Sequence, residues 1–197
     1  MKEYILDTNV FRYNTDSAHF EHRIPARIFW YTAKKEIANK QAVVYIPKEV
    51  RNELEVQSFT LGKDNQEIEE LLVICQEVTP SISTDKIEQQ IRIMSAYVRS
   101  KYGEKLRKDL NIKNVEYPER SDARILYTAY EKHAILVTSN LKDFILYPLL
   151  FGEKELKLYN LLTNQFVSIS PFLHTLIQQD PTFQDHLKTL QELETEE

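Results

Sequence analysis

Three short apolar segments constrain the fold of this chain more than any other feature of its sequence. They cover residues 3–6, 42–46 and 134–137, and each is followed at once by a polar residue or a proline. Segments of this length are too short for helices, and the stretches between them repeat apolar residues at helical spacing. Apolar strands that alternate with helices are typical of a parallel sheet covered on both faces. We therefore predict a three-layer α/β/α fold with a central parallel sheet and a helical insertion.

The remaining elements follow from apolar spacing and from helix-start signals. The polar segment 12–25 is interpreted as a loop. Ser121 is expected to cap the helix that precedes the third strand, and Pro171 to open a closing helical region. We predict further helices over 26–39, 47–58, 64–110 and 141–150, and late strands over 156–159 and 166–169.

One domain accounts for most of the 197 residues. We expect residues 1–175 to form it, with 60–115 inserted as a helical arm and 176–197 as an acidic helical tail. The single Cys75 excludes an intramolecular disulfide and fits a reducing compartment. No apolar run approaches the roughly 20 residues of a membrane span, and the N-terminus lacks a signal-peptide pattern. We therefore expect a cytoplasmic protein with no membrane partner.

The net charge of −5 is unevenly distributed. Residues 180–197 carry six acids against one base, so the rest of the chain is neutral in sum. Residues 84–113 carry eight bases against four acids, which makes a basic face available for RNA. A solvated helix surface explains this segment equally well. The candidate RNA-binding residues are Arg92, Arg99, Lys101 and Lys105.

Acidic residues gather near the predicted ends of the strands. Asp7 ends the first strand, Asp143 lies one helical turn beyond the third, and Asp122 starts the helix between. The helix after the second strand offers Glu49, Glu53 and Glu55. Asp7 could simply cap a helix, and Asp122 could simply be a first-turn acid that the helix dipole favours. Their joint placement at the carboxyl edge of one sheet instead suggests a hard divalent cation and phosphodiester hydrolysis.

Four segments of the sequence resemble motifs of PIN domains, a metal-dependent ribonuclease family with many bacterial toxins. They are LDTNVF, YIPKEVRNELE, SDARILYTAYEKHAILVTSNLKDF and FVSISPF, in that order. The resemblance implies that residues 1–175 form a PIN-like nuclease domain. It implies that Asp7, Glu53 and Asp122 hold the metal and act in catalysis, that Asn9 orients Asp7 or a water, and that Thr138 supports the strand-end loop.

The fourth acidic position departs from the commonest family pattern. Asn140 stands where many members have aspartate, and Asp143 lies three residues further on. We favour Asp143 as the fourth catalytic and metal-binding acid, with Asn140 as a neutral ligand or hydrogen-bonding partner. A site weakened at this position is the alternative.

The resemblance implies a Mg²⁺- or Mn²⁺-dependent endoribonuclease acting on RNA, and it leaves open a toxin role with an antitoxin partner and a homodimer. One alternative is a catalytically weakened PIN-like module that binds RNA or protein. A second is a phosphatase of the haloacid dehalogenase type, whose nucleophilic aspartate also ends the first strand. That motif requires a second aspartate two residues later, and this chain has Asn9 there.

Overall fold

The computed structural model describes the whole chain except residues 63, 83–84 and 196–197. The strands are β1 (Lys2–Leu6), β2 (Ala42–Pro47), β3 (Gln76–Val78), β4 (Ile135–Thr138), β5 (Leu158–Asn160) and β6 (Gln165–Phe166). The helices are α1 (Thr8–Arg12), α2 (Phe20–Ala38), α3 (Lys48–Leu61), α4 (Asp64–Leu72), α5 (Asp85–Asp109), α6 (Arg120–Glu131), α7 (Leu141–Phe144), α8 (Leu146–Leu149), α9 (Pro171–Gln178) and α10 (Pro181–Leu193).

The strands form one sheet in the order β3-β2-β1-β4-β5-β6. Every neighbouring pair is parallel except β5 and β6, which are antiparallel. Ile5 of β1 lies opposite Tyr45 of β2 and Leu136 of β4, and all three segments are those predicted from their apolar runs. The α/β fold class with a central, mostly parallel sheet is therefore confirmed.

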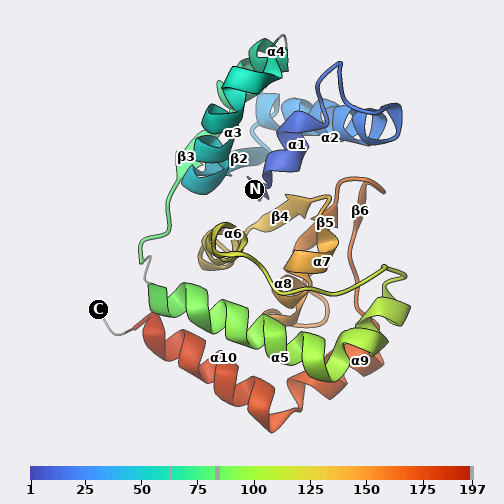
Figure 1. The fold of residues 1–197 in the computed structure, drawn as a ribbon, viewed down its shortest axis with the longest axis vertical. Helices are drawn as coiled ribbons and strands as arrows, with labels where there is room; N and C mark the ends of the chain where they lie inside the picture. The colour runs from blue at the N-terminus through green and yellow to red at the C-terminus, as the bar shows by residue number, and fades with distance from the viewer. Residues whose placement is uncertain (63, 83–84, 196–197) are drawn as a thin grey trace.

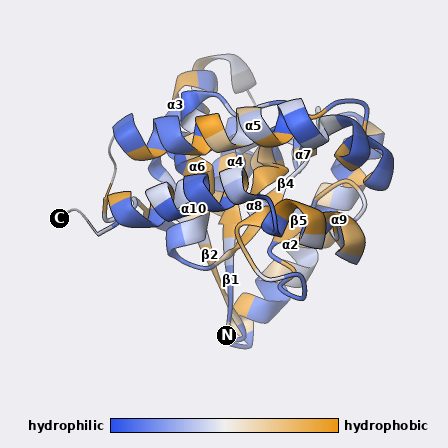
Figure 2. Ribbon diagram, turned by 90° about the horizontal axis from the view of Figure 1, so that it is seen from below, coloured by the Kyte–Doolittle hydropathy of each residue, from blue (hydrophilic) through white to orange (hydrophobic). Residues whose placement is uncertain are grey.

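Helices cover both faces of the sheet, as Figure 1 shows. α2 lies on one side, where Phe29 contacts the rings of Tyr4 in β1 and Tyr159 in β5. α6 lies on the other, α5 packs outside α6, and α10 packs outside α5. In Figure 2 the interior strands are largely orange and the outer helices largely blue, so burial of the apolar strands is what holds the layers together. No helix in the described ranges is long and apolar enough to cross a membrane.

Several sequence-based expectations for individual elements are wrong. α2 begins at Phe20, so the loop predicted over 12–25 is shorter. Residues 64–110 are not helical throughout, because Gln76–Val78 form a strand beside β2. The N-cap of α6 is Glu119, and Ser121 lies inside the helix.

The late elements also differ from expectation. The helix predicted over 141–150 is divided into α7 and α8, and the last strand is Gln165–Phe166 instead of 166–169. The parts of the predicted arm at 63 and 83–84, and of the predicted tail at 196–197, lie outside the described residues. The division of the chain at residue 175 stays a prediction.

A cluster around Asp180 fastens α10 to α5. Asp180 is 5% exposed and caps α10 through a hydrogen bond from the Thr182 N–H. Its Oδ2 also accepts hydrogen bonds from the Tyr97 and Tyr102 hydroxyls, each at 2.6 Å, and from the Lys101 ammonium at 2.8 Å. A buried carboxylate, both of whose oxygens accept hydrogen bonds, therefore fastens α10 to the rest of the domain.

Asp180→Ala is expected to lower the free energy of unfolding by about 3 kcal/mol, because it removes a helix cap and leaves two tyrosine hydroxyls without their acceptor. Lys101→Ala, which removes a half-exposed partner, should cost less than about 1 kcal/mol. Urea unfolding of both variants measures the difference. Equal losses would mean that the ion pair, and not the buried hydrogen bonds, fastens α10.

Candidate active site

The topology of the sheet brings the predicted acids to one edge. β1 and β4 are parallel neighbours, with Leu6 opposite Val137, so the residues that follow them emerge at the same end. β2 is parallel to β1 on the other side, and α3 continues directly from it. Ligands of open parallel sheets bind in the crevice beyond these carboxyl ends. Asp7, Glu53 and Asn140 all follow strands in this way.

Asp7 is buried, with 6% of its surface exposed. It caps α1, and its Oδ1 accepts a hydrogen bond from the Thr8 N–H at 2.7 Å. Its Oδ2 accepts one from the Thr138 hydroxyl at 2.8 Å. The pKa of Asp7 is raised to about 6, mainly by burial and to a smaller extent by the charge of Glu53, whereas these hydrogen bonds and one from Asn9 lower it. Asp7 is therefore held firmly in place with its charge poorly compensated.

Asp122 lies in the first turn of α6 and accepts a hydrogen bond from the backbone of Glu119, the N-cap residue. This is the acid half of a capping box. Burial raises the pKa of Asp122 to about 7, and the charges of Asp7 and Asp143 add to the increase. Asp122 therefore lies close enough to Asp7 and to Asp143, which come from two other segments of the chain, to be affected by their charges.

Asp143 is 8% exposed in the first turn of α7. Asn140 donates a hydrogen bond from Nδ2 to Asp143 Oδ2 at 2.5 Å. Burial raises the pKa of Asp143, whereas the Asn140 hydrogen bond and the charge of Lys142 lower it. The Asn140 backbone N–H in turn donates to the Thr138 hydroxyl at 2.8 Å. One chain of hydrogen bonds therefore links Asp7, Thr138, Asn140 and Asp143.

Glu53 joins the same group from α3. Its Oε2 accepts a hydrogen bond from the Thr8 hydroxyl at 2.6 Å, and its Oε1 accepts one from Gln57 at 2.9 Å. Thr8 thus bridges Asp7, through its backbone N–H, and Glu53, through its hydroxyl. The structure brings all four predicted acids together at the carboxyl edge of the sheet.

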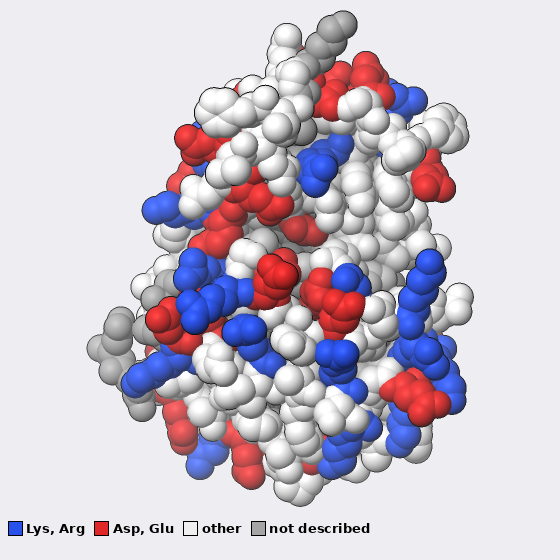
Figure 3. Space-filling model, in the orientation of Figure 1, with Lys and Arg blue, Asp and Glu red and all other residues white. Residues whose placement is uncertain are grey.

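A cleft of about 770 Å³ opens above these residues. Figure 3 shows acidic side chains around a hollow in the middle of this face, with basic side chains beside and below it. Asp7 is too buried to line the cleft. The lining consists of Glu49, Glu53, Arg99, Glu116, Tyr117, Glu119, Ser121, Asp122, Asn140, Lys142 and Asp143. Of these, Glu116, Tyr117 and Glu119 were not foreseen, because no motif or strand end marks them. Lys142 lies inside a quoted motif, but its place in the cleft was not foreseen either.

The donor chemistry of the cleft fits a hard divalent cation, since carboxylate, amide and hydroxyl oxygens are its ligands. Glu49 Oε2 is buried at the cleft without a hydrogen-bond partner among the described residues. In the present side-chain arrangement, however, no three His, Cys, Asp or Glu in the described ranges are grouped closely enough to hold a metal. Asp7, Glu53 and Asp143 are instead turned toward hydrogen-bond donors.

The four predicted RNA-binding residues lie in different surroundings. Arg99 lines the cleft, with its guanidinium 5.5 Å from the centroid of the Tyr117 ring. Arg92 donates a hydrogen bond to the Pro118 carbonyl at 3.2 Å, Lys101 contacts Asp180, and Lys105 is exposed on α5. Residues 99 and 101 point about 200° apart around the helix. Arg99 alone among the four is brought to the acids.

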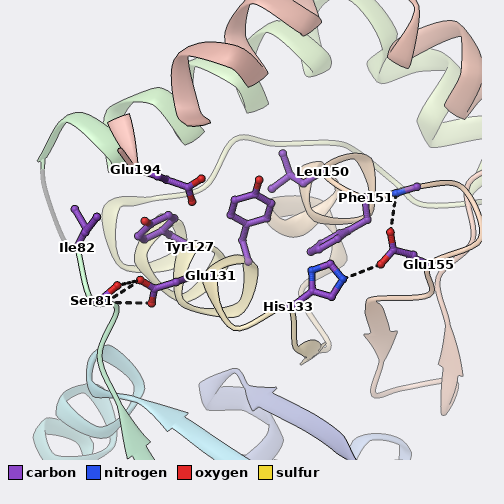
Figure 4. A pocket seen from close by; sticks show the side chains of 11 residues that line it. Ser81, Ile82, Tyr127, Glu131, His133, Leu150, Phe151, Glu155 and Glu194 are labelled. Carbon is purple, nitrogen blue, oxygen red and sulfur yellow. Dashed lines mark hydrogen bonds and ion pairs between the residues drawn. The ribbon is translucent and has the colours of Figure 1, made fainter. Parts of the chain in front are cut away.

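A second cavity, of about 510 Å³, lies at the other end of α6 (Figure 4). Ser81 donates hydrogen bonds to Glu131 there, and His133 contacts Glu155 at 2.8 Å. This cavity adjoins the start of β4, away from the carboxyl edge of the sheet, and its carboxylates are already engaged. The carboxyl-edge cleft is therefore the candidate active site.

No protein-family model and no curated protein sequence matches the chain. Among solved structures, the chain is similar to the crystal structure of VapBC2 from Rickettsia felis bound to a DNA fragment from their promoter. The TM-score is 0.49 at 19% sequence identity, over 80% of this chain and 98% of the other. The function proposed below rests on the residues of the cleft and not on this likeness.

Proposed function

We propose that this chain is a Mg²⁺- or Mn²⁺-dependent endoribonuclease that hydrolyses RNA phosphodiester bonds. The observation that carries the proposal is the gathering of four acids at the carboxyl edge of the sheet, where Glu53, Asp122 and Asp143 line one cleft and Asp7 is linked to it through Thr8 and Thr138. Such uncompensated negative charge is neutralised naturally by a divalent cation. The motif resemblance to PIN domains supports the same residues, because it independently assigns acidic positions of a ribonuclease family to Asp7, Glu53 and Asp122.

In this proposal Asp7, Asp122 and Asp143 hold the cation, with Glu53 beside them. A bound divalent cation polarises the scissile phosphate, activates a water and neutralises the charge that develops. The Thr8 N–H and the Thr138 hydroxyl orient Asp7, and Asn140 orients Asp143. Outer hydrogen bonds of this kind keep ligand oxygens correctly aimed.

Two basic side chains make the acidic cleft compatible with an anionic substrate. Arg99 and Lys142 both line it, and Lys142 also pairs with Glu116 at 3.0 Å. Cations beside the acids attract phosphate groups that the carboxylates alone would repel. We assign to Arg99 the contact with substrate phosphate, since the ring of Tyr117 is its partner in the cleft and no carboxylate among the described residues forms an ion pair with it.

Cleavage of a mixed RNA pool is expected to require Mg²⁺ or Mn²⁺, to stop on chelation and to return when Mn²⁺ is restored. Because ligation relieves the repulsion between the acids, Mn²⁺ should also raise the melting temperature, a readout independent of cleavage. Gel assays and thermal unfolding with and without chelator provide the measurements. Full activity after exhaustive chelation would contradict the metal-dependent mechanism.

The motif resemblance to PIN domains supports two further parts of the proposal. The chain is the toxin of a toxin–antitoxin pair, and its protein partner is the antitoxin. Co-expression with the product of an adjacent small gene, followed by a search for a stable complex, tests this role directly. A homodimer and a cytoplasmic location stay predictions from the sequence.

A catalytically weakened module that binds RNA or protein is the second candidate function. The observation in its favour is that the carboxylates, as they stand, are engaged in hydrogen bonds and are not grouped around a metal position in the described ranges. The Mn²⁺ experiment separates the candidates. Stabilisation by Mn²⁺ together with cleavage supports the nuclease, whereas RNA binding with neither effect supports the module.

A further inference from the structure

Arg99, Gly103 and Arg107 lie on one face of α5, because they are spaced four residues apart. A glycine inside a helix of 25 residues costs about 1 kcal/mol relative to alanine. A Cβ built at Gly103 would meet only the Arg99 side chain, at 3.8 Å. The glycine is therefore not required by crowding; its effect is to leave an open space between two guanidinium groups.

The chain after α5 folds back and forms the opposite wall of this space. Asn111 adopts a left-handed conformation with φ of 51°, and the Ile112 N–H donates to the Arg107 carbonyl at 3.1 Å. Further along, the Glu116 N–H donates to the Lys142 carbonyl at 2.9 Å. The segment 113–117 is thus fixed at both ends alongside α5.

The result is a groove of about 270 Å³ with a basic lining. It is lined by Arg99, Gly103, Glu104, Arg107, Lys113, Asn114 and Val115. Its one carboxylate, that of Glu104, pairs with Lys108 at 2.7 Å. The charge of Glu104 also acts on Arg107, but three cations of the lining face this single carboxylate, so the groove keeps a net positive charge.

The groove adjoins the acidic cleft, and Arg99 lines both. Tyr117 stands at the junction with 45% of its surface exposed and the Arg99 guanidinium beside its ring. An exposed aromatic ring next to a basic groove is the usual arrangement for single-stranded nucleic acid, in which bases stack and phosphates track the cations.

We propose that the groove between α5 and segment 113–117 holds the sugar–phosphate backbone of single-stranded RNA on one side of the scissile bond. A base adjoining the cleft stacks on Tyr117, Arg99 contacts the phosphate at the junction, and Arg107 and Lys113 contact phosphates further along. This path rests on the proposed function for its direction into the cleft. In this proposal the residues that bind RNA together with Arg99 are Arg107 and Lys113. They take the place of Arg92, Lys101 and Lys105, which were expected from the sequence.

Binding of a short fluorescein-labelled oligouridylate, measured by anisotropy without metal so that no cleavage occurs, tests the groove. Arg107→Ala with Lys113→Ala is expected to weaken binding at least about tenfold, and to reduce the slope of log affinity against log salt by about 1.4, or about 0.7 for each lost phosphate contact. The matched control, Lys101→Ala with Lys105→Ala, removes equal charge from α5 outside the groove and should weaken binding less than about twofold.

A second pair of variants tests the open space itself without changing any charge. Gly103→Gln places a long side chain between Arg99 and Arg107 and should weaken binding, whereas Gly103→Ala should not. Both residues favour the helix more than glycine does, so both proteins should stay folded. The same RNA in a duplex should bind more weakly than the single strand.

The proposal is overturned if the control pair weakens binding as much as the groove pair, if Gly103→Gln binds normally, or if the duplex binds equally well. These outcomes are separable from failure of the nuclease proposal. RNA binding through the groove without any cleavage would support the groove proposal and contradict the nuclease proposal. Cleavage of RNA by the wild type, with RNA binding unchanged in the groove variants, would contradict the groove proposal alone.

Discussion

Asp7→Asn is expected to reduce RNA cleavage at least about a hundredfold while making the protein more stable at pH 7.5. Loss of a preorganised charge at a reaction centre typically costs about 10²–10³ in rate. The fold should survive, because asparagine has the shape of aspartate and its oxygen can still cap α1. Cleavage assays on matched preparations measure the first effect, and urea unfolding measures the second.

The stability effect has a definite pH dependence. The pKa of Asp7 is raised by burial to about 6 in the folded protein from an ordinary value near 4. The folded state therefore binds the proton more tightly than the unfolded state, and the stability from this group is present below about pH 4 and lost as pH rises through about 6. Asp7→Asn should be more stable than the wild type by up to about 3 kcal/mol at pH 7.5, since the pKa rises by about two and each pKa unit corresponds to about 1.4 kcal/mol. At pH 4 the two proteins should differ little.

Asp185→Asn is the control for this experiment, because Asp185 is an exposed acid on α10. It should change neither cleavage nor the pH dependence of stability. Undiminished cleavage by Asp7→Asn, with contaminating nuclease excluded, would remove Asp7 from the site. A variant that is less stable than the wild type at pH 7.5 would show that the hydrogen bonds to Asp7 outweigh the burial of its charge.

Asp143→Asn should weaken Mn²⁺ binding and cleavage strongly, at least about a hundredfold, because a charged ligand contributes more to holding a cation than a neutral amide. Asn140→Ala should have a smaller effect, about tenfold, since Asn140 acts by holding Asp143 through a hydrogen bond of 2.5 Å. Asn140→Asp should fall between the wild type and Asp143→Asn: it adds a negative charge, but it also places two carboxylates in contact.

Titration of Mn²⁺ and cleavage rates for the three proteins, side by side, decide between the two residues. The reverse ordering, with Asn140→Ala the more damaging, would make Asn140 the ligand and reduce Asp143 to a first-turn acid of α7. Thermal unfolding without metal serves as a check, because a loss of about 1 kcal/mol with normal Mn²⁺ affinity would be the effect of a purely local role at the start of α7.

The three central strands and the position of the acids at their carboxyl ends were determined by local sequence. Apolar segments over 3–6, 42–46 and 134–137 are typical of parallel strands in a sheet that is covered on both faces. Once these strands are parallel, the residues after them meet at one edge, and this is why Asp7 and Asp143 could be predicted together. Periodicity and strand ends are local features, so they are visible in a single sequence.

Only the tertiary structure decided which surfaces lie opposite one another. β3 carries two exposed residues and one apolar one, so nothing in its sequence marks a strand; its pairing with Tyr45–Pro47 is made by backbone hydrogen bonds. Glu116 reaches the cleft because its N–H bonds to the distant Lys142 carbonyl. Arg99 and Lys101 look equivalent in the sequence, yet α10 brings Asp180 to Lys101 and leaves Arg99 at the acids. A helical repeat shows which residues share a face, but the partner of that face is selected by contacts between residues far apart in the chain.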